Sequence, residues 1–223
     1  MRCRLSLAIL SICLAVNVAQ AGPWLRDEGS GFTSLSYSGT YFLDTAQANY
    51  LEYAWRDDLT LGADISFYTD RYGAPSGEAT LFFRRPLSDS ESVHRFAYEL
   101  GLGARWSQFA LLPHLKTGLS WGRGLTLGER HGWSNIDAAI LWDLVEKSHR
   151  IKLDSTIGLS FNARFTGMMQ LYLTHENTRS YAKLAPALVV ALGKGKTRLQ
   201  IGAEIPLRNR YDTALKLALW RDF

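Results

Sequence analysis

The chain has 223 residues, a formal net charge of +4 at pH 7 and two cysteines, Cys3 and Cys13. The charge is too small to indicate a nucleic-acid partner, and the chain beyond Cys13 can have neither a disulfide nor thiolate chemistry. No run after residue 21 is apolar enough for a transmembrane helix. The length fits one domain, and seven Trp, ten Tyr and ten Phe give it a heavy aromatic load.

The first 21 residues have the organisation of a secretory signal peptide. Arg2 and Arg4 form a basic start, residues 5–16 form an apolar segment too short to span a bilayer, and residues 19–21 (Ala-Gln-Ala) are a small-x-small cleavage site. We therefore expect residues 1–21 to be removed before Gly22. Residues 22–223 should then form a single outer-membrane β-barrel domain.

Apolar and polar residues alternate in blocks of about ten residues, the length that a tilted strand needs to cross a bilayer. In one block Phe96, Tyr98 and Leu100 share one face, whereas Arg95 and Glu99 share the other. Twelve such blocks occur: Gly31–Tyr41, Ala48–Trp55, Leu59–Tyr68, Glu78–Arg85, Arg95–Arg105, His114–Trp121, Asn135–Leu144, Ile151–Phe161, Met169–Thr174, Leu184–Leu192, Arg198–Ile205 and Thr213–Phe223. The fold class predicted is therefore all-β, a transmembrane antiparallel barrel of twelve strands with short loops on both sides.

Two features leave alternatives to this fold open. The link Arg123–Trp133 is long for a periplasmic turn and Trp133 falls on no clean face, so ten strands is the main alternative count. A soluble periplasmic β-sandwich would also alternate, but it would not carry large aromatics on one face of nearly every strand together with charges and glycines on the other. An even strand number places both termini at the periplasmic side, and Phe223 supplies the C-terminal aromatic that is typical of outer-membrane barrels.

Charged residues on the polar parity should face the lumen. They comprise seven acids and eight bases, with His114 in addition. This near-balance predicts ion pairs across a narrow interior rather than a strong preference for one ion sign. The residues expected to line the lumen are Glu52, Asp64, Arg84, Arg95, Glu99, Arg105, His114, Lys116, Asp137, Lys152, Asp154, Lys183, Arg198 and Glu204, with Glu78 and Lys216 on the same parity.

No residue pattern indicates catalysis, a metal or a cofactor. The outer-membrane lipid hydrolases require His and Ser two residues apart on a strand, and no His-x-Ser occurs among the five histidines. No two histidines have the spacing of a metal site, and His175-Glu176 at a strand end is more typical of a solvated turn.

Several segments of the chain resemble a family of short-loop outer-membrane barrels whose members are uncharacterised or are associated with meta-pathway phenol degradation as transporters. The resemblance rests on five segments: Gly22–Arg26 with Gly31-Phe32, Glu52–Gly62, Phe165–Met168, Tyr181–Pro186 and Leu219–Phe223. It implies an outer-membrane location and uptake of a small, aromatic solute, and it carries over no functional residue.

The sequence thus favours a monomeric barrel that acts as a narrow channel for passive passage of a small solute. A closed structural or interaction barrel of the cell envelope is the second interpretation, and an outer-membrane lipid hydrolase is the third and weakest. The expected partners are outer-membrane lipid and the barrel-assembly machinery, which would recognise the end of the chain that contains Phe223.

Overall fold

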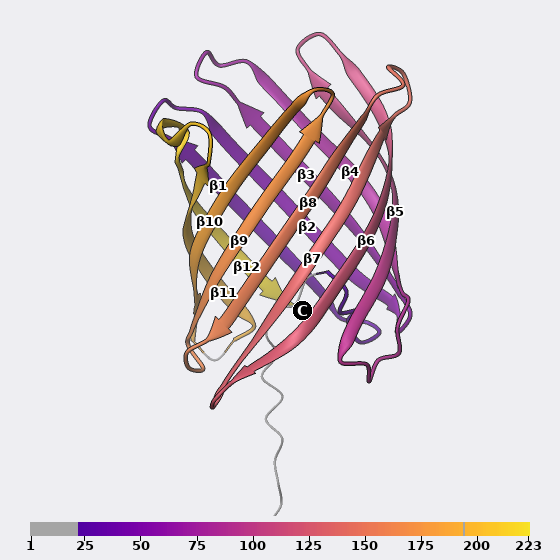
Figure 1. The fold of residues 1–223 in the computed structure, drawn as a ribbon, viewed down its shortest axis with the longest axis vertical. Helices are drawn as coiled ribbons and strands as arrows, with labels where there is room; N and C mark the ends of the chain where they lie inside the picture. Colours follow the sequence, from indigo (N-terminus) through magenta and orange to yellow (C-terminus); the bar gives the residue numbers. More distant parts are fainter. Residues whose placement is uncertain (1–21, 194) are drawn as a thin grey trace, which may run out of the picture.

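The computed structural model describes residues 22–223 apart from residue 194. These residues form a closed antiparallel barrel (Figure 1). Its strands are β1 (Gly31–Thr40), β2 (Thr45–Arg56), β3 (Leu59–Thr69), β4 (Pro75–Pro86), β5 (His94–Ser107), β6 (Leu111–Leu127), β7 (Arg130–Asp143), β8 (His149–Ser160), β9 (Phe165–Glu176), β10 (Arg179–Ala191), β11 (Thr197–Pro206) and β12 (Ala214–Asp222), with a short 3-10 helix, η1 (Arg210–Asp212), before β12. The prediction of twelve strands is confirmed, and the alternative of ten is wrong.

Each strand pairs with its neighbours in sequence, and β1 pairs with β12 to close the ring. The first and last strands therefore run antiparallel, and both ends of the barrel wall lie at the same rim. We call this rim the periplasmic end and the opposite rim the extracellular end. No connection between two strands exceeds seven residues, so no loop is long enough to fold deeply into the barrel.

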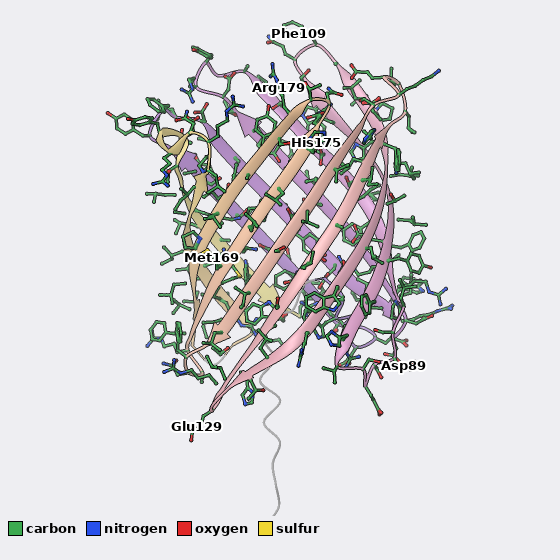
Figure 2. All side chains as sticks on the ribbon, in the orientation of Figure 1. Asp89, Phe109, Glu129, Met169, His175 and Arg179 are labelled. Atoms are coloured by element: carbon green, nitrogen blue, oxygen red, sulfur yellow. The ribbon has the colours of Figure 1, made fainter. Side chains whose placement is uncertain are left out.

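Large apolar side chains cover the outer surface, as the alternation predicts. Leu81, Leu102 and Leu217 are 68%, 63% and 53% exposed, and Met169 points away from the barrel in Figure 2. A surface of this kind is stable against lipid acyl chains, because the closed ring leaves no backbone group unpaired at an edge. Among the described residues, no helix has both the length and the apolar character needed to cross a membrane.

The long link expected between residues 123 and 133 is wrong. The region is instead a hairpin in which β6 continues to Leu127 and β7 starts at Arg130, and Glu129 lies at its tip at the periplasmic end (Figure 2). Trp133 belongs to the inner face of β7 and is only 4% exposed. The alternation fails here because a large apolar side chain takes an inward position.

The short block expected at residues 169–174 is likewise incomplete. The strand β9 has twelve residues, Phe165–Glu176, and pairs with β8 and β10 along its length. Met168 is buried on the inner side, where it contacts Trp133 and Val189. Because the inward-facing Met168 is apolar, the alternation of polar and apolar residues does not reveal that β9 starts at Phe165.

The C-terminal residue completes the seam between β1 and β12. The backbone nitrogen of Phe223 donates to the carbonyl of Gly31 at 3.0 Å, and the nitrogen of Gly31 donates to the carbonyl of Phe223 at 3.1 Å. The ring of Phe223 covers Gly31 so closely that a Cβ there would lie 2.2 Å from the ring atom Cζ. Glycine is therefore required at residue 31 for this aromatic ring to lie flat against the strand.

Candidate functional site in the barrel lumen

A ladder of alternating charges crosses the lumen near its periplasmic half. Glu52, which is 1% exposed, accepts hydrogen bonds from Arg26 Nε at 2.6 Å, Tyr50 Oη at 2.8 Å and Arg84 at 3.1 Å. Arg84 also donates to Glu99 at 2.8 Å, and the ladder continues from there to Lys116. Because a buried charge without a partner costs several kcal/mol, the alternation of signs is what makes this interior tolerable.

The ladder extends at both ends. Lys116 Nζ lies 2.5 Å from Glu99 Oε1. At the other end Arg26 donates to Asp222 at 2.9 Å, and Arg198 lies 3.4 Å from the second oxygen of Asp222. The ladder thus ties the chain before β1 to strands β2, β4, β5, β6, β11 and β12.

Two further clusters lie nearer the extracellular end. Glu78 pairs with Arg150 and lies 3.8 Å from Lys152 Nζ. Glu204 lies 3.0 Å from Lys216 and 3.4 Å from Lys183. In both clusters one glutamate faces two cations, so each cluster pairs opposite charges as expected but contains one more base than acid.

Three shorter acids have no ion pair among the described residues. Asp64, Asp137 and Asp154 all line the central cavity of the barrel, and Asp137 and Asp154 are direct register partners on β7 and β8. Asp137 Oδ2 accepts from Asn135 at 2.6 Å, and the hydroxyl of Ser120 lies beside the same carboxylate, whereas the buried Oδ1 has no partner at normal hydrogen-bond geometry within the described part of the chain. The centre of the lumen therefore holds three carboxyl groups with no base at ion-pair distance, in a cavity that is also lined by Arg84, Lys116 and Lys216.

Two cavities run in series along the lumen. The outer cavity, of about 620 Å³, opens among the extracellular loops at Asp44 and Asp212 and reaches inward to Asp154. The central cavity, of about 340 Å³, also contains Asp154 and extends to Trp133 and Gly22 on the periplasmic side. Both linings contain Asp64, Asp154 and Lys216, so the two cavities adjoin at mid-lumen and lie in series from the extracellular rim; together we call them the lumenal path.

The predicted lumen residues fall into four places. The central cavity contains Asp64, Arg84, Glu99, Lys116, Asp137 and Asp154, and the outer cavity contains Asp64, Lys152, Asp154, Lys183 and Glu204. Glu52 and Arg198 lie in the ladder, and Arg105 and His114 line a separate small cavity. Arg95 joins none of these groups, because its guanidinium donates to the carbonyl of Asp89 in the β4–β5 turn.

Sequence reasoning missed four residues that complete these networks. Arg150 and Glu176 are inward residues of β8 and β9, and Arg105 lies 2.5 Å from Glu176. Continuing the parity of Lys152 and Thr174 by one step would have found both. Arg26 precedes the first strand and has no periodic signal, whereas Asp222 lies on the same parity of β12 as Lys216 and could have been found by continuing it.

The extracellular rim has its own charged cluster outside the lumen. Arg71 donates to Asp44 at 2.7 Å and to Asp212 at 3.0 Å, and its guanidinium stacks 4.8 Å above the ring of Phe42. The hydrogen bond from Arg71 lowers the pKa of Asp44 below its usual value. These contacts join the β1–β2, β3–β4 and β11–β12 connections.

One histidine lies close to a serine, although not with the spacing of the known lipid hydrolases. His175 Nδ1 is 2.9 Å from Ser180 Oγ, because the two are opposite each other across the β9–β10 hairpin. Both are exposed, and no acid is hydrogen-bonded to the ring of His175 in the described chain. Within the same residues, no group of three or more His, Cys, Asp or Glu side chains could hold a metal ion.

No protein-family model and no curated protein match this chain. Solved structures do match it in fold. The KdgM porin has a TM-score of 0.63 at 10% identity over 86% of this chain and 99% of its own, and the same porin in complex with disordered oligogalacturonate has a TM-score of 0.57 at 11% identity over 87% and 99%. The COG4313 outer membrane channel from Pseudomonas putida F1 has a TM-score of 0.54 at 12% identity over 92% of this chain and all of its own.

These similarities establish the fold of an outer-membrane β-barrel. Together with the closed twelve-stranded ring and its apolar outer surface, they support a bacterial outer-membrane location. The structural neighbours named here are a porin and a channel.

Proposed function

We propose that the protein is a narrow outer-membrane channel for passive passage of small solutes. The observation that carries this proposal is the lumenal path of two adjoining cavities, which starts at the extracellular rim and reaches past the middle of the barrel. A barrel that served only as a scaffold would be expected to fill its interior, as eight-stranded barrels do.

The charges along the path favour cations and neutral solutes over anions. The lumenal glutamates are each paired with a base, whereas Asp64, Asp137 and Asp154 face the central cavity without an ion pair among the described residues. Rings of carboxylates give pores a preference for cations. Oligogalacturonate, the anion bound by the KdgM porin of the same fold, is therefore a poor candidate for this lumen.

The end of the central cavity is compatible with an aromatic solute. Phe32, Trp133 and Trp220 line it together with the polar groups. A small neutral aromatic molecule could lie against these rings while its polar group contacts the carboxylates. This supports the solute class implied by the family resemblance.

Biogenesis follows from the proposed location. Residues 1–21 would act as a cleaved secretory signal, which lies outside the described residues. The barrel-assembly machinery would recognise the end of β12 with Phe223, and the mature barrel would act as a monomer in outer-membrane lipid.

The test is single-channel recording of refolded protein in a planar bilayer, with folding shown by the heat-dependent gel shift. Discrete current steps, with a reversal potential in a KCl gradient that indicates cation preference, are expected. Replacing both Asp64 and Asp154 with Asn should reduce that preference, whereas Asp58→Asn at the exposed periplasmic rim should not. Folded protein that passes no current at any applied voltage, and that still passes none after residues 23–26 are deleted, would refute the channel.

A closed envelope barrel is the second candidate function. This function is favoured by the segment before β1, which lies inside the lumen at its periplasmic end and contacts the inner face of the barrel. If folded protein with that segment shortened still passes no current, the closed barrel is supported.

A further inference from the structure

The chain before β1 does not hang from the rim of the barrel but crosses its interior. Residue 31 begins β1, yet Gly22 lies against Asn135 and Asp137 of β7. In the ring of twelve strands β7 is six places from β1 in either direction. Residues 22–30 therefore span the full width of the lumen, inside the lower part of the barrel in Figure 1.

Side chains hold this segment at its middle. Trp24 packs against the buried cluster of Trp133, Met168 and Val189, three inward residues from β7, β9 and β10. It also covers Gly122 of β6, where a Cβ would lie 2.4 Å from Trp24 Cη2. Apolar side chains that face a water-filled interior are stabilised when another apolar group covers them, and Trp24 covers this cluster.

Charge holds the segment near β1. Arg26 donates to Glu52 and Asp222, and its guanidinium lies 4.9 Å from the centre of the Phe32 ring. Arg26 is thus a member of the charged ladder, although it belongs to no strand.

The segment lies where the lumenal path stops. Gly22 and Trp133 both line the central cavity. Trp24, two residues further along the segment, packs against Trp133. Loops cannot obstruct the pore, because none exceeds seven residues. The only part of the described chain that crosses the interior is this one.

The contact at Gly22 has a particular chemistry. A Cβ on Gly22 would lie 3.0 Å from Asp137 Oδ1 and 3.3 Å from Oδ2. The nitrogen of Gly22 is two bonds from that position, so it lies within about 6 Å of the carboxylate. Asp137 Oδ1 is the buried oxygen that has no partner at normal hydrogen-bond geometry in the described chain.

We propose that residues 22–26 form a gate that closes the periplasmic half of the channel, and that the α-amino group of Gly22 locks it by pairing with Asp137. The proposal rests on the proposed channel function and on cleavage after Ala21. Hydrolysis of the Ala21–Gly22 bond adds water, which leaves a carboxylate on Ala21 and an amine on Gly22. The amine takes up a proton at neutral pH. The uncharged amide of the precursor thereby becomes a cation with three donors beside an acceptor that lacks one.

Two variants test whether the segment closes the pore. The first deletes residues 23–26 and keeps Gly22, so that cleavage is preserved but the segment is too short to cross the lumen. The second, Gly122→Ala, places a methyl group in the space of Trp24 and leaves the segment intact. The matched control is Gly118→Ala on the same face of β6, where the nearest atoms to a Cβ are 3.4 Å away.

Two further changes test the lock. In the first, a Met is added before Gly22, so that the α-amino group lies one residue further from Asp137. In the second, Asp137→Asn removes the charge of its partner. The control is Asp154→Asn, which removes the same charge from the register partner without contacting Gly22. All proteins are prepared without tags, with the N-terminal residue verified by mass and folding verified by the gel shift.

The readout is single-channel current of each folded protein. Deletion of residues 23–26 should leave the channel open for most of the time, Gly122→Ala should raise the open fraction about tenfold, which corresponds to the loss of one contact, and Gly118→Ala should leave it unchanged. The extra Met and Asp137→Asn should each raise it, and their combination should add nothing further. With Asp154→Asn the extra Met should have its full effect.

Each contrary outcome has a separate meaning. Equal currents from wild type and the shortened protein would refute the gate and leave the channel standing. Larger currents from the shortened protein, with additive effects of the extra Met and Asp137→Asn, would refute the lock. Silence from both folded proteins would refute the channel and the gate together.

Discussion

The buried ladder predicts that Glu52→Gln, which keeps the size and shape of the side chain, lowers the stability of the barrel strongly. Glu52→Gln keeps the shape of the side chain and keeps one oxygen acceptor, but it removes the charge that faces Arg26 and Arg84. Glu52 is almost fully buried and accepts three hydrogen bonds. Both cations would then share the remaining acids, and each would be partly unneutralised in a region with little water.

The magnitude follows from the contacts that remain. Removing one partner from a buried ion pair costs about 3–5 kcal/mol when the other charge is left alone. Here Arg26 keeps Asp222 and Arg84 keeps Glu99, so we expect Glu52→Gln to lower the free energy of unfolding by about 2–3 kcal/mol. The matched control is Asp58→Asn at the periplasmic rim, where Asp58 and Arg85 are 51% and 48% exposed. An exposed pair of this kind is worth no more than about 1 kcal/mol.

Equilibrium unfolding by urea in lipid vesicles, followed by tryptophan fluorescence and by the gel shift, measures both values. A second variant, Glu52→Gln with Arg84→Met, removes a cation along with the acid and leaves Glu99 paired with Lys116. It should be no less stable than Glu52→Gln alone, because the unneutralised charge is gone. If Glu52→Gln costs no more than Asp58→Asn, the ladder does not stabilise the barrel in the way argued.

Two further predictions concern the ends of the barrel. Gly31→Val should reduce the amount of folded protein in the outer membrane as strongly as deletion of Phe223, because a side chain at residue 31 displaces the terminal ring; normal insertion of either variant, compared on a heat-shift gel, would count against this. At the extracellular rim Arg71 lowers the pKa of Asp44, so the stabilisation is present above the ordinary pKa of an aspartate and is lost as pH falls through the lowered value. The difference in urea midpoint between wild type and Asp44→Asn should therefore exist at pH 7 and vanish in strong acid, and a constant difference would contradict the assignment.

The sequence predicts the barrel wall well because its physical basis is local. A strand in a bilayer must place apolar side chains outward at every second residue, so Leu81 and Leu102 identify their strands without knowledge of any partner. The count of twelve strands and the side on which the termini meet follow from this pattern alone.

The pattern fails at Trp133 and Met168, and it fails for one reason. Both are apolar residues on the inward parity, and both pack around Trp24. Periodicity assumes that the inside of the barrel is polar, and it cannot foresee a segment from outside the strands that makes part of the interior apolar. These two differences from the predicted wall thus lie where the N-terminal segment is held, whereas the late start predicted for β10, at Leu184 instead of Arg179, lies away from it.

The charge partners could be predicted as a class but not as pairs. The near-balance of inward charges predicts pairing, but not the partners. Arg84 of β4 pairs with Glu52 of β2 across one intervening strand, and Arg105 of β5 pairs with Glu176 of β9. Such choices depend on how the strands curve and on side-chain length. That length also explains why the glutamates are paired and Asp64 and Asp154 are not.

The contact between Arg26 and Asp222 constrains the order in which the molecule can be made. These residues are 196 positions apart, and they join the segment before β1 to the last strand of the barrel. The wall cannot close before the C-terminal strand has arrived, and contacts of such long sequence separation form slowly. Arg26 and Trp24 must then be enclosed while the ring closes, because a ring that closed first would leave this segment outside the lumen.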